Sequence, residues 1–314
     1  MKKFIYLTAA VLMAIVFAAS CGSAPEPVAV PEPEPPPPVV YTPPPPPPVQ
    51  EEEAEEEEVE PDTSAPVISI NLSPELFSPD GDGVDDLLTV SIGIETQSEI
   101  YSWHIEIREP NPPYNIFSSW EGYGMPPSEL VWDGYSTEGE LVQSAMEYHF
   151  SIRVTNIYGN YSIYQGTIWI DVLVIREGDT LRVIVPAIVF AANMGDFQGL
   201  DEYNLQSNDR ILRRIAEVLN HFHTYNVLVE GHANPTTPPG TTARNNEERG
   251  TARDIGLQPL SEARARAVMN YLIYLGVDGE RLSYIGMGGT RTVVEFEDRE
   301  NWWKNRRVEF ILVR

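Results

Sequence analysis

The stretch from Pro25 to Glu60 limits what the rest of the chain can fold into. Its first part, from Pro25 to Val49, is dominated by proline, with unbroken runs at 35–38 and 43–48. Such a segment cannot build a core, and it favours an extended polyproline II spacer of roughly 75 Å. The acidic run that follows, from Glu51 to Glu60, predicts a solvated, self-repelling extension of this spacer; a docking strip for a basic partner is the alternative. Folded domains are therefore expected only after this stretch.

The first twenty residues have the pattern of a secretion signal. Two lysines precede an apolar run from Phe4 to Ala19, which is short for a permanent membrane-spanning helix. The run ends in Ala18-Ala19-Ser20-Cys21-Gly22, which resembles a bacterial lipobox with Ala18 in place of the usual leucine. Because Cys21 is the only cysteine of the chain, we expect its lipidation; ordinary cleavage after Ser20 is the alternative. Several acyl chains would anchor the protein lastingly in a membrane.

Composition narrows the class of protein further. A length of 314 residues predicts two domains besides the signal and spacer. The net charge of −26 argues against nucleic acid as a partner. The residue after Cys21 is glycine rather than the aspartate that commonly retains lipoproteins at the inner membrane, which favours the periplasmic side of the outer membrane.

Residues 65–176 show short β-type runs separated by proline, glycine and asparagine. This pattern predicts an antiparallel sandwich. The expected strands are 67–70, 87–94, 103–107, 148–155 and 167–175. The segments from Phe77 to Asp86 and from Trp132 to Gly134, with the late pair from Tyr148 to Asn160, resemble Ig-like modules of flagellar hook-capping and surface proteins. The resemblance implies a spacer or a protein-binding module rather than an enzyme.

Acidic side chains gather on a glycine-bent loop in this region. The residues are Asp80, Asp82, Asp85 and Asp86. Their oxygens suit a hard cation, so a structural Ca²⁺ is one interpretation and the only cofactor we consider. The loop begins like an EF-hand, but Ser91 occupies the twelfth position, where that motif needs glutamate. The alternative is a turn in which the aspartates accept hydrogen bonds from nearby backbone amides.

The C-terminal part is organised around an amphipathic helix. Ser261 is the expected N-cap and Gly276 the expected end of this helix, with Arg264 in its first turns. Gly231-His232-Ala233-Asn234 precedes the helix after a strand, and Gly286-Met287-Gly288 and Asn305-Arg306-Arg307-Val308-Glu309 follow it. These four elements, in this order, resemble the OmpA-like peptidoglycan-binding domain. The resemblance covers residues 177–314 and implies an α+β fold of order β-α-β-α-β with helices on a mixed sheet.

The resemblance also implies a ligand site. In the family, an aspartate and an arginine clamp the ammonium and carboxylate of diaminopimelate in the peptidoglycan stem peptide. The arginine corresponds to Arg264, but the aspartate position holds Asn234, and the loop 235–259 is longer than usual. Charged residues of this loop could replace the missing charge or cover the site: Arg244, Glu247, Glu248, Arg253 and Asp254. Asn193 and Arg306 are further candidate contacts, with a turn former and a partner of neighbouring acids as their alternatives. We expect His232 to be structural, and Arg307 and Glu309 to face solvent.

Three functions compete on these observations. The first is a lipoprotein that ties the outer membrane to the cell wall. The second is an interaction or adhesion protein whose Ig-like module binds a protein partner while the C-terminal domain anchors it. The third is an enzyme, which the sequence disfavours because it contains no nucleophile elbow, zinc-binding helix motif or phosphate-binding loop.

Overall fold

The computed structural model describes residues 62–251 and 256–314. The signal, Cys21 and the proline-rich and acidic spacer lie outside this part of the chain. The described residues belong to a single compact unit. Within them, no helix is both long and apolar enough to span a bilayer.

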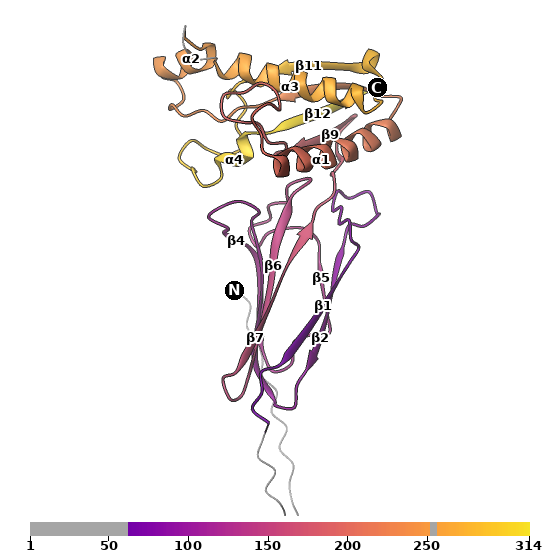
Figure 1. The fold of residues 1–314 in the computed structure, drawn as a ribbon, viewed down its shortest axis with the longest axis vertical. Helices are drawn as coiled ribbons and strands as arrows, with labels where there is room; N and C mark the ends of the chain where they lie inside the picture. The colour runs from indigo at the N-terminus through magenta and orange to yellow at the C-terminus, as the bar shows by residue number, and fades with distance from the viewer. Residues whose placement is uncertain (1–61, 252–255) are drawn as a thin grey trace, which may run out of the picture. The chain divides into compact units, whose positions relative to one another are not determined.

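Seven strands form two sheets N-terminal to the helical part of the chain (Figure 1). They are β1 (Val67–Ser73), β2 (Leu88–Glu95), β3 (Ile100–Arg108), β4 (Ile116–Tyr123), β5 (Glu129–Trp132), β6 (Glu147–Asn156) and β7 (Tyr161–Trp169). The order is β1-β2-β5 in one sheet and β4-β3-β6-β7 in the other, and every named pair is antiparallel. Alternate residues of β6, such as Phe150 and Ile152, point into one hydrophobic core, as the period of two requires.

Two of these strands were not predicted, and one predicted strand is displaced. Strand β5 has only four residues, and β4 carries polar residues at both faces, so neither shows a long apolar run. The expected strand 167–175 is apolar because most of its residues are buried, but only its first residues belong to β7. Strand β7 ends at Trp169, and Val172 and Leu173 are buried beyond its end. Side chains rather than a neighbouring strand accept from the backbone amides here: Asp171 accepts from Val172, Ser144 from Leu173 and Asp80 from Val174.

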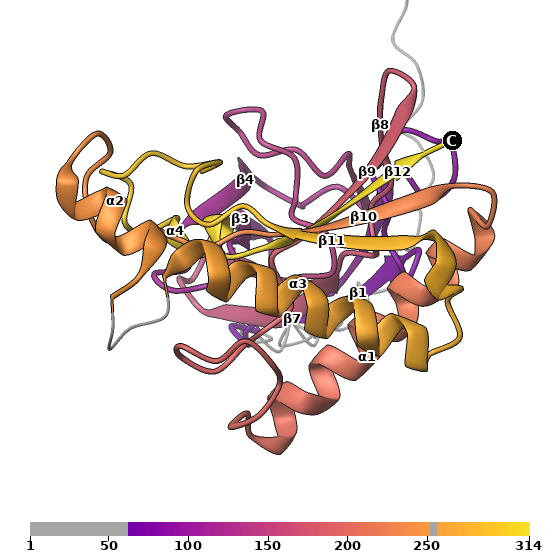
Figure 2. The same cartoon turned by 90° about the horizontal axis from the view of Figure 1, so that it is seen from above.

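The C-terminal part is a five-stranded sheet with helices. Its elements are β8 (Ile175–Glu177), β9 (Thr180–Val185), α1 (Glu202–His221), β10 (Asn226–Gly231), α2 (Thr242–Arg249), α3 (Leu257–Tyr274), the 3₁₀ turn Gly279–Arg281, β11 (Leu282–Gly286), α4 (Trp302–Asn305) and β12 (Val308–Val313). The strand order is β11-β10-β12-β9-β8. Only β10 and β11 are parallel, so the sheet is mixed. Figure 2 shows α1 and α3 together along this sheet, and their apolar side chains join those of the strands in one core.

Helix α3 begins earlier than predicted. It starts at Leu257, with Gly256 as its N-cap, so the prediction of Ser261 as the cap is wrong. Pro259 is tolerated there because the first-turn amides need no helical partner. The Ser261 hydroxyl instead donates to the Gln258 carbonyl at 2.9 Å and accepts from the Gly288 amide at 2.8 Å. The predicted end is confirmed: the helix stops at Tyr274 and Gly276 has a φ of +93°.

Candidate functional site

The turn before α1 and the first half of α3 hold the guanidinium of Arg264. Its Nε donates to the Met194 carbonyl at 3.0 Å. The guanidinium carbon lies 4.9 Å from the centre of the Phe190 ring, a cation–π distance. Burial, together with the nearby positive charge of Arg306, lowers the pKa of Arg264 to about 10. At neutral pH the side chain therefore remains a cation held in a place where its charge is poorly solvated.

Arg306 brings a second cation to the same place. It follows α4 directly and is exposed, and the partial burial of its guanidinium lowers its pKa. Among residues 62–251 and 256–314, no carboxylate forms an ion pair with Arg264 or Arg306. Both arginines line a cavity of about 660 Å³ together with Phe190, Ala192 and Tyr203. Arg264 is half-buried and Arg306 is exposed, both lie at the wall of one cavity, and neither has an acid partner in the described part of the chain. Such a pair of cations suits an anion such as a carboxylate.

Asn234 and Asn193 lie beside this site but are not among the residues that line the cavity. The Asn234 amide oxygen accepts from Asn305 at 2.9 Å, and its nitrogen donates to the Pro235 carbonyl at 3.0 Å. Asn305 is buried and uses its own oxygen to accept from the amide of Val293 at 2.7 Å. Asn193 is exposed in a turn with a φ of +59°, a backbone conformation that asparagine tolerates well. Ligand contact by Asn234 and by Asn193 stays a prediction.

Comparison with known proteins covers this region of the chain. The OmpA family profile matches residues 199–306. That range includes α1, β10, α3, β11 and both arginines of the cavity.

Residues 199–306 form an OmpA-family domain.

The named relatives align with only part of this chain. A peptidoglycan-associated lipoprotein of Mesorhizobium japonicum is 34% identical over 121 residues, which is 38% of this chain and 63% of that protein. Another, from Pseudomonas putida, is 42% identical over 65 residues, or 21% of this chain and 38% of that protein. The chain thus spans less than two thirds of these relatives. A solved peptidoglycan-associated lipoprotein of Burkholderia pseudomallei is 23% identical with a TM-score of 0.28, covering 40% of this chain and 87% of that one.

Glycines let helix α3 of the OmpA-family domain approach the strand ends closely. A Cβ on Gly231 would lie 2.1 Å from the Ser261 carbonyl oxygen, and one on Gly286 would lie 2.4 Å from the Glu262 amide. Both distances are too short for any side chain, so glycine is required at these positions. The close approach places the first turns of α3, and with them Arg264, beside the ends of β10 and β11.

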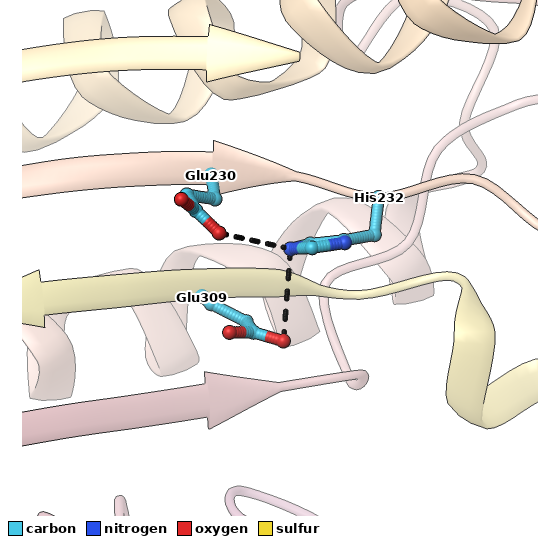
Figure 3. Close-up of side chains that lie close together, drawn as sticks. All are labelled: Glu230, His232 and Glu309. Atoms are coloured by element: carbon cyan, nitrogen blue, oxygen red, sulfur yellow. Dashed lines mark ion pairs between the residues drawn. The ribbon is translucent and has the colours of Figure 1, made fainter. Parts of the chain in front are cut away.

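A buried charge network lies on the sheet of the same domain. Figure 3 shows His232 between the carboxylates of Glu230 and Glu309; its Nε2 is 3.5 Å from one and 3.6 Å from the other. Each carboxylate also pairs with an arginine, Glu230 with Arg291 at 3.2 Å and Glu309 with Arg307 at 2.6 Å. The three side chains stand close enough for a metal ion, but the arginines already balance both negative charges. We therefore interpret the group as a structural network.

Arg307 and Glu309 were expected to face solvent, and that expectation is wrong. Both are buried, with relative exposures of 6% and 4%. The reason is that Arg307 donates to Glu309, and Glu309 lies opposite Glu230 on the neighbouring strand, so both belong to the network around His232. Burial of ions is tolerated when each has a partner at hydrogen-bond distance.

The long loop 235–259 folds partly into α2, which the sequence analysis did not predict. Glu247 accepts four hydrogen bonds from the amides and hydroxyls of Thr236 and Thr237. Glu248 accepts from the Gly289 amide at 3.0 Å and pairs with Arg244 at 3.1 Å. These charges hold the loop to itself and to the segment after β11, so they are not free to replace the missing aspartate at position 234. Arg253 and Asp254 lie outside the described residues.

The acidic loop of the β-sheet part gathers three of its four predicted aspartates. Asp80, Asp82 and Asp86 offer oxygens within reach of one ion, whereas Asp85 is not part of this group. The carboxylates also accept backbone bonds: Asp86 from Gly81 at 2.7 Å and from Gly83 at 2.8 Å. These bonds fit the turn interpretation. Calcium stays a prediction, checked by whether added Ca²⁺ raises the melting temperature and whether Asp86→Asn abolishes the rise.

Proposed function

We propose that this chain is a non-catalytic lipoprotein that ties a membrane to the cell wall by binding peptidoglycan non-covalently through its OmpA-family domain. The observation that carries the proposal is that the half-buried Arg264 and the exposed Arg306 line one cavity, with no acid partner for either among residues 62–251 and 256–314. The two relatives named above are both peptidoglycan-associated lipoproteins, which supports the same conclusion.

The ligand group that suits this cavity is the carboxylate of a peptidoglycan stem peptide. The Arg264 fork is fixed by the Met194 carbonyl on one side and the Phe190 ring on the other, so its remaining N–H groups keep a defined direction. Arg306 adds a second positive charge. Asn234, at the position of the family's aspartate, would accept a hydrogen bond from an ammonium but offers no charge. A neutral acceptor is worth roughly 1 kcal/mol against about 1.5–3 for a charged one, which weakens binding by on the order of tenfold.

The anchor at the other end is the lipidated Cys21, and the proline-rich spacer gives it reach. We place the protein on the periplasmic side of the outer membrane, with residues 21–64 bridging to the folded part. The two sheets of residues 65–176, packed face to face around one core, fit an Ig-like sandwich that acts as a rigid spacer before residues 177–314.

The test is retention of the full chain, in detergent, on purified peptidoglycan. Arg264→Ala is expected to reduce retention by at least tenfold, because it removes the central carboxylate donor. Arg266→Ala is the matched control: it removes the same charge from the same helix at an exposed position. Asn234→Asp is expected to strengthen binding. If the wild-type chain is not retained, or if the two arginine variants behave alike, the proposal fails.

A second function is supported by the exposed aromatic side chains of the β-sheet part. Tyr101 and Tyr123, with exposures of 57% and 82%, pair edge-to-face on the outer surface. In this alternative the Ig-like module binds a protein partner and the OmpA-family domain only anchors it. Labelling of residues 65–176 on intact cells would favour a surface role, and strict protection from the label would count against it.

A further inference from the structure

A second cavity, of about 570 Å³, lies on the outer face of the sheet β4-β3-β6-β7. It is lined by side chains of β3, β6 and β7 and by Tyr114 from the β3–β4 turn. Tyr114 and His149 line the first cavity as well, so the two hollows share a wall. The two rings meet edge-to-face with centroids 5.0 Å apart. An extended ligand leaving Arg264 would therefore meet this pair before it reaches the second cavity.

Strand β6 links the two cavities. Its outward residues Glu147 and His149 line the first cavity, and His149, Ser151 and Arg153 line the second. Successive outward residues of a strand are spaced by about 6.6 Å, so the row from Glu147 to Arg153 extends for about 20 Å. This is a length suited to a polymer of several units rather than to a single small molecule.

The side chains of the second cavity suit a polar ligand with little charge. Arg108 pairs with Glu106 at 2.6 Å, and Arg153 stacks over the Tyr161 ring at 3.9 Å. The neighbouring positions are histidine, serine and glutamine, which both donate and accept hydrogen bonds. Polar side chains beside an exposed aromatic side chain suit a saccharide. The sugar hydroxyls need hydrogen-bond donors and acceptors, and the C–H face of the sugar packs on the aromatic ring.

An ion triad centred on the buried Lys304 holds the Tyr114 turn close to the segment that carries Arg306. Lys304 donates to Glu109 at 2.9 Å and to Glu140 at 2.7 Å, and the side chains of Lys304 and Glu109 are only 6% and 8% exposed. Glu109 begins the turn that carries Tyr114, and Lys304 stands two residues before Arg306. This contact therefore holds the β-sheet part against the OmpA-family domain at the place where the two cavities meet.

We propose that the outer face of β3, β6 and β7, entered past Tyr114 and His149, is a saccharide subsite that binds the glycan strand of the same polymer whose stem peptide is held at Arg264. The inference rests on the proposed function, because the two cavities must serve one ligand. It assigns to the β-sheet part a direct share in wall binding rather than a spacer role alone.

The experiment compares two ligands for the full chain in detergent: a free stem peptide, and the same peptide attached to a short glycan strand. The test variant is Ser151→Ala with Gln165→Ala, which removes two polar side chains that face each other across β6 and β7 and line the second cavity but not the first. Tyr123→Ala is the control, since it removes an exposed aromatic from the same sheet away from both cavities.

The wild-type chain is expected to bind the glycan-linked peptide more tightly than the free peptide. The double variant should lose about fivefold in affinity for the glycan-linked peptide, as expected for the loss of about 1 kcal/mol of hydrogen bonding, and should bind the free peptide as the wild type does. Arg264→Ala should weaken both ligands. Equal wild-type affinities, or a double variant that binds the linked peptide unchanged, would overturn the saccharide subsite alone. Failure of the wild type to bind either ligand would overturn the proposed function and the subsite with it.

Discussion

The buried His232 gives the protein a pH dependence whose sign can be worked out from its surroundings. Two carboxylates lie within 3.6 Å of its Nε2 and favour the protonated ring. Burial opposes them, and so do the positive charges of Arg307, Arg291 and Arg182. Burial and the arginines prevail, and they lower the pKa of His232 to about 4 from an ordinary value of 6.5.

A lowered histidine pKa destabilises the fold in acid. The unfolded chain takes up a proton below pH 6.5, whereas the folded chain does so only near pH 4, so stability falls as the pH is lowered through this window. With these two values, the loss between pH 7 and pH 5 is about 2 kcal/mol, and it reaches about 3 kcal/mol at pH 4. Above pH 7 the contribution no longer changes.

The assay is chemical denaturation of the wild type and of His232→Asn at pH 5, 6 and 7. The free energy of unfolding of the wild type should fall by about 2 kcal/mol more than that of the variant between pH 7 and pH 5. Only this difference is compared, so any loss of stability from the substitution itself cancels. His221→Asn, at an exposed histidine of α1, should keep the wild-type dependence. If the wild type gains stability on acidification relative to His232→Asn, the carboxylates outweigh the arginines and the reasoning is refuted.

Three further substitutions test the packing that holds the site. Lys304→Met should lower the free energy of unfolding by about 3–5 kcal/mol, because it leaves the buried Glu109 carboxylate without its partner. Adding Glu109→Leu should restore most of that loss. A double-mutant cycle by chemical denaturation measures the coupling, and additive effects of the two substitutions would contradict the prediction. Gly231→Ala should destabilise by at least about 1–3 kcal/mol, since its Cβ meets the Ser261 carbonyl; an unchanged melting temperature would show that the strand end can shift freely. Leu272→Ala, at a fully buried position of α3, should cost about 2–5 kcal/mol by thermal denaturation, and a cost below 1 would mean that the helix is loosely packed.

Much of the OmpA-family domain could be predicted from local pattern. The helix that carries Arg264 and its end at Gly276 follow from apolar spacing and from a left-handed glycine, which are local properties. The helix start was misplaced because serine is a good N-cap in general, while here the Ser261 hydroxyl is taken by the Gly288 amide, 27 residues away. Apolar runs located most of the strands of the β-sheet part, but the run 167–175 misplaced β7, and β4 and β5 were missed.

The sequence by itself predicted a signal-like start, a proline-rich spacer, a β-rich part and an OmpA-like end with Arg264 on a helix. Those features depend on composition and on residues close together along the chain. Tertiary structure alone decided that Arg306 joins Arg264, that His232 lies among buried charges, and that Lys304 meets Glu109 across 195 positions. Such contacts depend on strand register and on packing between distant segments. Residue type sets only which partners a buried charge requires, and the fold decides where those partners lie.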